Sequence, residues 1–133
     1  MDRVHNLAML IARVLMCVLF LEGGWVKLTN PGTIQAAFGQ RYGLPLPVLA
    51  WLIAWIVELF GGLAILFGVY ARAAGLILAI WCVATAFVGH LNWAERNMEI
   101  HFWKNMAMCG GFLYVFCFGA GIYSVDRLRT RHR

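Results

Sequence analysis

Four long apolar stretches constrain this chain more than any other feature of its sequence. They cover roughly residues 7–28, 46–70, 73–91 and 105–123. Each is close to the ~20 residues that a helix needs to cross a hydrocarbon core about 30 Å thick. None shows the strict polar–apolar alternation of a barrel strand, so helices are the spanning elements left. We therefore predict an all-α, membrane-embedded four-helix bundle, with residues 1–133 forming a single transmembrane domain.

The composition excludes an ordinary soluble domain. Hydrophobic residues make up 62% of the chain and charged residues only 13%, about half the charged fraction of a soluble domain. A chain of this length has too little interior to hide such an apolar excess, so lipid must cover part of its surface. We expect the first stretch to be retained and not cleaved as a signal peptide, because it contains Arg13 and Glu22 and lacks a small-residue cleavage site before Lys27.

Basic residues divide unequally between the two sides of a four-span chain, whose termini must share one side. Cytoplasmic segments carry the excess of Lys and Arg, so the richer side, which holds the termini, is predicted to be cytoplasmic. The net charge of +5 then reflects topology rather than nucleic-acid binding. Arg13 and the basic tail are expected to reach anionic lipid headgroups. The richer side has Arg3, Arg13, Arg72, Arg127, Arg129, Arg131 and Arg133, and the other has Lys27, Arg41, Arg96 and Lys104.

The longer connections lie on the side away from the termini. The segment Asn30–Gln40 is predicted to form a short helix in the membrane interface, with Asn30 as its cap and Pro31 at its first position. The loop 92–104 mixes charged residues with tryptophan and phenylalanine, which is typical of an interfacial aromatic belt. These two loops are therefore where a lid over a site would lie.

Polar side chains from all four predicted spans fall at similar depths, as the helical rise of 1.5 Å per residue shows. A carboxylate in mid-membrane costs roughly 2.5–3.5 kcal/mol and cannot reach far for water, so each acid must pair, bind something or carry a proton. The lysines are equally compatible with reaching the interface, and a lone histidine at a helix end is usually an interfacial residue. We predict one cavity in the outer half of the bundle, lined by Glu22, Lys27, Glu58, His90, Lys104 and Asn105.

Glycine doublets and cysteines also fall inside the predicted spans. Small residues let membrane helices approach closely, so the doublets 23–24, 61–62 and 110–111 are interpreted as packing seams. Cys17, Cys82, Cys109 and Cys117 form no CxxC pair and have no metal-ligand spacing. They are interpreted as free thiols packed as small apolar residues.

Nearly the whole chain carries an ordered set of short motifs. The set consists of Arg13, Phe20, Gly24-x-x-Lys27-Leu28, Gly43-Leu-Pro45, Glu58-Leu-x-Gly61-Gly62, Gly68-x-x-x-Arg72, His90, Lys104-Asn105 and Gly119-x-Gly121-x-Tyr123-Ser-x-Asp126-Arg127. This set resembles the DoxX family of small four-helix membrane proteins. The resemblance implies a four-helix bundle in the bacterial inner membrane, and it is closest to short members of quinol oxidase subunit type. Some relatives are subunits of thiosulfate:quinone oxidoreductase. Glu58 fits the family pattern better than Glu22 does.

Three functions are compatible with these features, and a quinone- or quinol-linked oxidoreductase subunit is placed first. A quinone needs an apolar slot, hydrogen bonds to two oxygens and a titratable group. We assign proton handling to Glu58 and Glu22, and ligand binding to Lys27, His90, Lys104, Asn105 and Trp25, with Trp81 or Phe87 as further flanks of the ring. No haem, flavin, Fe–S or metal motif is present, so another redox subunit would supply electrons.

The alternatives are an accessory or scaffold protein and a small proton or solute pathway. In an accessory or scaffold protein, the polar cluster would only stabilise the helix bundle or its self-association. One interhelical hydrogen bond in a membrane is worth about 0.6 kcal/mol, so a purely structural cluster would need several. The pathway reading ranks last, because four helices are few for alternating access.

Overall fold

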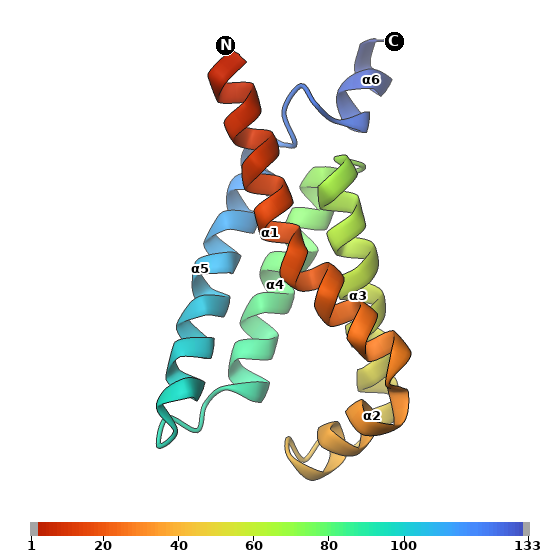
Figure 1. Cartoon of the computed structure of the whole chain (residues 1–133), viewed down its shortest axis with the longest axis vertical. Helices are drawn as coiled ribbons and strands as arrows, with labels where there is room; N and C mark the ends of the chain where they lie inside the picture. Colours follow the sequence, from red (N-terminus) through yellow and green to blue (C-terminus); the bar gives the residue numbers. More distant parts are fainter. Residues whose placement is uncertain (1–2, 132–133) are drawn as a thin grey trace.

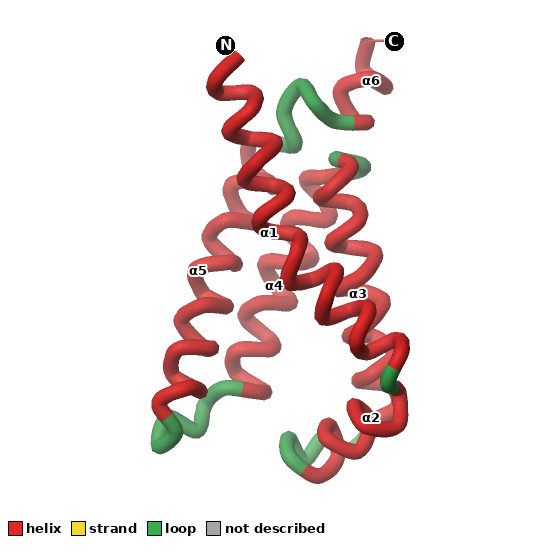
Figure 2. Tube along the Cα trace, viewed as in Figure 1, coloured by secondary structure: helices red, strands yellow, loops and turns green. Residues whose placement is uncertain are grey.

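The computed structural model describes residues 3–131, which form six helices with no strand among them (Figure 2). Helices α1, α3 and α4 are long and apolar enough to cross a membrane, judged by length and composition. The prediction of an all-α chain is thus confirmed. Arg133, counted above in the basic tail, lies outside the described residues. The helices are α1 (Arg3–Thr29), α2 (Pro31–Gln40), α3 (Pro47–Phe67), α4 (Ala71–Gly89), α5 (Arg96–Phe118) and α6 (Val125–Arg131).

The long helices pack as two pairs, α1 with α3 and α4 with α5, and α3 joins the pairs through its contacts with α4. Figure 1 shows that the described ends of the chain, at α1 and α6, lie at the same end of the molecule. The short helix α2 lies at the opposite end, where it packs mainly against α3. The candidate site forms at this end of the molecule.

The fourth predicted stretch, 105–123, is shifted relative to the helix that forms. Helix α5 begins at Arg96, after Glu95 in extended backbone, and ends at Phe118. Gly119 ends it with a φ of 78°, a conformation that glycine adopts without steric cost. The first turns of α5 are polar, because they take in the charged part of the loop 92–104. For that reason α5 is not among the three helices whose composition suits a membrane span.

The predicted short helix is present as α2, but its expected cap is absent. Asn30 precedes Pro31, which occupies the first turn as predicted, yet no side-chain bond caps the helix. The Asn30 amide instead donates to the carbonyl of Val26 at 3.1 Å and to the hydroxyl of Thr29 at 3.0 Å. Asn30 therefore closes the end of α1 rather than the start of α2.

The turn between α3 and α4 is tight and is closed by α6, a helix that the sequence analysis did not predict. Gly68 adopts a φ of 66°, and a Cβ atom there would collide with Ser124. Both carboxylate oxygens of Asp126 accept backbone N–H bonds, from Tyr70 and Ala71, each at 2.8 Å. A carboxylate on the first N–H groups of a helix is a stabilising cap, so α6 supplies the N-terminal cap of α4.

Arg13 does not reach headgroups, contrary to the expectation above. It is 3% exposed, and its guanidinium donates to the carbonyls of Ala120 at 2.7 Å, Tyr123 at 2.8 Å and Leu66 at 3.2 Å. Leu66 lies in the last turn of α3, where C=O groups lack helical partners, and Ala120 and Tyr123 lie in the segment between α5 and α6. Arg13 thus ties α1 to the end of α3 and to the α5–α6 connection.

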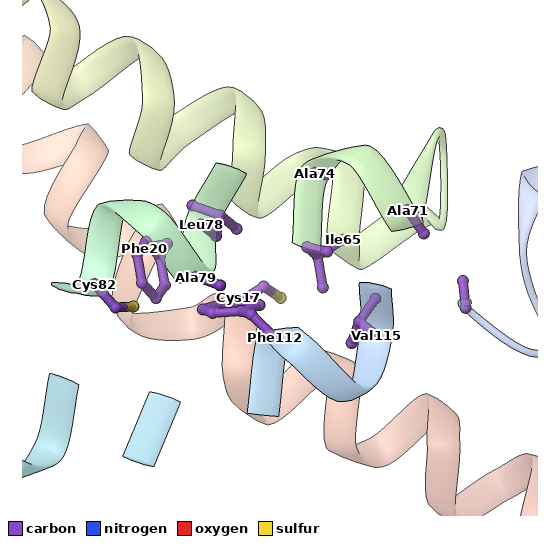
Figure 3. Packing of buried hydrophobic residues seen from close by; sticks show 11 residues of the cluster. Cys17, Phe20, Ile65, Ala71, Ala74, Leu78, Ala79, Cys82, Phe112 and Val115 are labelled. Carbon is purple, nitrogen blue, oxygen red and sulfur yellow. The ribbon is translucent and has the colours of Figure 1, made fainter. Parts of the chain in front are cut away.

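Aromatic and small residues fill the core where the two pairs meet (Figure 3). Phe20 and Phe112 pack edge to face with ring centroids 5.1 Å apart. The glycine seams are confirmed in part: a Cβ atom on Gly24 would lie 2.7 Å from the backbone nitrogen of Leu59, whereas one on Gly110 would meet nothing within 4 Å. All four cysteines are free thiols, as predicted.

Candidate functional site

A cavity of about 480 Å³ opens at the α2 end of the molecule, between the two helix pairs. Helices α1, α3, α4 and α5 all contribute to its wall, and the segment around α2 adds Phe38, Tyr42 and Leu44. Most of the wall is apolar or aromatic. The polar side chains among its lining residues are Lys27, Tyr42, Glu58, Trp81, Thr85, His90, Lys104 and Asn105.

Glu58 of α3 lies at the inner end of this cavity with both carboxylate oxygens occupied. Oε2 accepts from Lys27 Nζ at 2.7 Å, and Oε1 accepts from the indole N–H of Trp81 at 3.1 Å. The side chains of Glu58 and Lys27 are 11% and 20% exposed. Charge-assisted bonds of this kind are about twice as strong as neutral ones. The predicted interior orientation of Glu58 and its partner from another helix are therefore both present.

Gly23 makes the approach of α1 to Glu58 possible. A Cβ atom on Gly23 would lie 2.7 Å from Glu58 Oε2 and 3.4 Å from Lys27 Nζ. Lys27 lies one turn further along α1, so its side chain reaches back over Gly23, whose carbonyl is 3.4 Å from Nζ. The backbone of Lys27 is also held, since its carbonyl accepts the indole N–H of Trp51 at 2.6 Å. The glycine and the lysine thus act together to place one cation on Glu58.

A second polar group lies at the mouth of the cavity. His90 follows the last residue of α4, and its ring lies 5.3 Å from that of His101 on α5. Lys104 Nζ is 3.1 Å from Nδ1 of His101. The buried Nδ1 of His90 has no hydrogen-bond partner among residues 3–131. Burial, followed by the nearby His101, Lys104 and Arg41, lowers the pKa of His90. The neutral ring therefore has one nitrogen free to bond an incoming polar atom.

Two residues of the predicted site lie elsewhere. Glu22 is exposed, Trp25 is 60% exposed, and neither lines the cavity. A step of one residue turns a helix by 100°, so with Gly23 against Glu58 the neighbouring Glu22 points away from it. Phe87, expected as a flank of the site, is 54% exposed and packs against Phe102 instead. Position along the helix was therefore not enough to predict that these side chains would face away from the cavity.

Several lining residues were missed by the sequence analysis. Trp81, Thr85 and Val88 line the cavity from α4 at spacings of four and three, a helical face that the pattern already contained. Trp81 was considered only as a flank of a ring, yet it is a hydrogen-bond donor to Glu58. No local sequence pattern predicts that Phe38 and Tyr42 line the cavity, because only the packing of the segment around α2 brings them there.

The arrangement suits a mainly apolar molecule that carries hydrogen-bond acceptors. Lys27, Lys104, Asn105 and neutral His90 can all donate hydrogen bonds, and the remaining wall is hydrocarbon and aromatic. Glu58 is the carboxylate among the lining residues. Among the described residues, no group of three or more His, Cys, Asp or Glu side chains could hold a metal ion.

Comparison with known proteins supports the resemblance stated above. The DoxX family model matches residues 8–91. The chain is 40% identical to the inner membrane protein YqjF of Escherichia coli over 98% of each chain. It is 32% identical to the inner membrane protein YphA of the same organism, over 90% of this chain and 88% of that one. No solved structure matches this chain.

Proposed function

The chain belongs to the DoxX family, and we propose that it is an inner-membrane protein whose cavity binds a quinone or quinol for a membrane oxidoreductase. The membrane part of this proposal is supported by the names of the two E. coli relatives and by the apolar helices. One observation carries the ligand part. A cavity with a largely apolar wall contains hydrogen-bonding groups from separate helices, among them the Glu58–Lys27 ion pair and the side chains of His90, Lys104 and Asn105.

The size and chemistry of the cavity fit a quinone ring. Its volume of about 480 Å³ falls in the range of roughly 300–1,000 Å³ that is usual for small-molecule sites. The two oxygens of a quinone lie on opposite edges of a flat ring and need separate donors. Lys104, Asn105 and the unpartnered nitrogen of His90 offer donors from α5 and the end of α4, and the ammonium of Lys27 offers a donor from α1. Phe20 and Phe38 in the wall can contact the faces of the ring.

When bound, a quinone accepts two electrons and two protons, and the chain's own residues would handle the protons. Glu58 can take up or release a proton at Oε1 or Oε2, while Lys27 and Trp81 hold the carboxylate in position. We further propose that another subunit supplies the electrons, because the sequence contains no haem, flavin or cluster motif.

We also propose that α5 is a fourth membrane span, with both termini in the cytoplasm. The extensive packing of α5 against α4 and the full burial of Phe112 support its place beside the apolar helices. The described ends of the chain lie together in Figure 1, at the end that also carries the larger share of Lys and Arg. The charged first turns of α5 would then lie in the opposite interface.

Quinone binding can be tested by titrating the purified protein in detergent with decyl-ubiquinone and a short-chain menaquinone analogue. Trp81 in the cavity wall makes tryptophan quenching a suitable readout. Glu58→Gln should weaken binding by about fivefold to tenfold, since it removes the charge of one hydrogen-bonded wall group. Glu22→Gln is the matched control and should bind like the wild type, because Glu22 is exposed and outside the cavity.

A purely structural role has one specific observation in its favour, which is that both oxygens of Glu58 are already paired within the chain. On that reading the protein would be an accessory or scaffold subunit. Absence of saturable quenching, together with absence of quinone in solvent extracts of protein purified from its membranes, would contradict our proposal and favour this second function.

A further inference from the structure

A second hollow lies at the other end of the molecule, between the α3–α4 turn and the segment that leads from α5 into α6. Its volume is about 1,150 Å³. Three arginines line it, Arg72 from the start of α4 and Arg127 and Arg129 from α6. The hollow therefore has cationic side chains on two separate chain segments, which face one space. We call it the arginine groove.

The arginines of this groove lack an anionic partner within the described chain. Asp126 is the carboxylate in the lining, and both of its oxygens already accept the N–H groups of Tyr70 and Ala71. Over residues 3–131, Lys27–Glu58 is the ion pair with nitrogen and oxygen within 4 Å. All three guanidinium groups are exposed, and that of Arg129 is held 4.8 Å from the centre of the Tyr70 ring. The groove thus carries net positive charge, with three arginines against one carboxylate in its lining.

Apolar side chains adjoin this charge. Phe118 at the end of α5 is 68% exposed, and Ile122 in the following segment is 43% exposed. Both line the groove beside the arginines. The groove also lies where α4 begins and α5 ends, which is the level of lipid headgroups for helices that cross a bilayer. One surface therefore offers cations at headgroup depth and hydrocarbon next to them.

We propose that the arginine groove binds the phosphate of an anionic phospholipid, with the acyl chains passing along Phe118 and Ile122. Arginine suits this ligand because its planar guanidinium donates paired hydrogen bonds to phosphate oxygens. A soluble anion would use the arginines but not the exposed apolar residues. The inference is independent of the quinone proposal, because the two sites lie at opposite ends of the molecule.

The test uses the full-length protein in zwitterionic detergent micelles and a fluorescent short-chain phosphatidylglycerol as the probe. Each basic residue near an anionic lipid surface adds about fivefold to affinity. We expect Arg72→Gln, Arg127→Gln and Arg129→Gln to weaken binding about fivefold each and about a hundredfold when combined. Lysine at the same three positions should restore part of the affinity, because it keeps the charge and loses the paired geometry.

The matched control removes the same charge elsewhere, through Arg3→Gln, Arg41→Gln and Arg96→Gln, all at exposed positions outside the groove. This variant should bind like the wild type. Equal loss in both triple variants would overturn the proposal in favour of net charge alone. Unchanged lipid binding in the groove variants would overturn the proposal outright. If the triple groove variant does not fold, the three single variants decide the test. Competition by millimolar inorganic phosphate, but not by unlabelled phosphatidylglycerol, would assign the groove to a soluble anion instead.

Discussion

Arg13 and Glu58 are both buried charges in the same helix assembly, 3% and 9% exposed, and they are held in different ways. Arg13 donates to three backbone carbonyls, one at the end of α3 and two in the segment between α5 and α6. Glu58 is held by two side chains, Lys27 and Trp81, beside a cavity of about 480 Å³. Backbone carbonyls cannot rotate away, whereas a lysine side chain can. The comparison indicates that the Arg13 region is a fixed structural joint and that the Glu58 region can change its partners.

The largest effect expected from this comparison is on stability at the Arg13 joint. Arg13→Met removes the donor to three carbonyls that have no helical partner, and each unsatisfied buried group costs about 1–3 kcal/mol. We expect the free energy of unfolding to fall by roughly 3–5 kcal/mol. Unfolding by sodium dodecyl sulfate in mixed micelles, followed by circular dichroism, would measure it.

The control for this change is Arg3→Met, on the same helix at an exposed position. It should leave stability within about 0.5 kcal/mol of the wild type. Quinone binding by the Arg13 variant, measured below its unfolding midpoint, should also be retained, because Arg13 does not line the cavity. A stable Arg13→Met protein that loses ligand binding would reverse the roles assigned to the two regions.

A smaller effect is expected at the glycine that admits Glu58. Gly23→Ala places a methyl group 2.7 Å from Glu58 Oε2 and must displace the carboxylate or open the α1–α3 contact. Such overpacking costs about 1–3 kcal/mol. Gly110→Ala has open space around its new methyl group and removes a flexible residue from a helix.

The two glycine variants should therefore move stability in opposite directions, with Gly110→Ala neutral or stabilising by up to about 1 kcal/mol. Both are measured by the same unfolding titration. If the Gly23→Ala protein is as stable as the wild type and binds decyl-ubiquinone equally well, the site does not require the close contact between α1 and Glu58.

The smallest expected effect is on how stability depends on pH, to which His90 should contribute and Arg13 should not. Because burial lowers the pKa of His90, the unfolded chain takes up a proton at this residue before the folded chain does. Stability should therefore fall as the pH drops from about 6.5 towards the lowered value, with no contribution from His90 above that range. Arg13 should add no such dependence, since its guanidinium stays protonated.

His90→Gln is the variant that isolates this dependence, because His101, Lys104 and Arg41 beside it are kept. Unfolding titrations at several pH values between about 8 and 5 should give a shallower loss of stability for His90→Gln than for the wild type. Parallel curves for the two proteins would show that His90 is not shielded from protons in the folded state.

Position along a helix was readable from the sequence because it needs only a count of residues. That count placed six residues in one layer, and all of them except Glu22 line one cavity, namely Lys27, Glu58, His90, Lys104 and Asn105. The apolar stretches, the all-α class and the family were readable for the same reason, since each depends on local pattern or on the order of motifs.

Helix rotation and long-range partners were decided only by the tertiary structure. Glu22 and Glu58 look alike as isolated acids in apolar stretches, and the close approach of α1 at Gly23 brings only Glu58 into the interior. Arg13 pairs with carbonyls more than fifty residues away, which no local pattern encodes. A sequence fixes how far along a helix each side chain lies, while the neighbouring helices fix which way it faces, because packing against them selects one rotation of each helix.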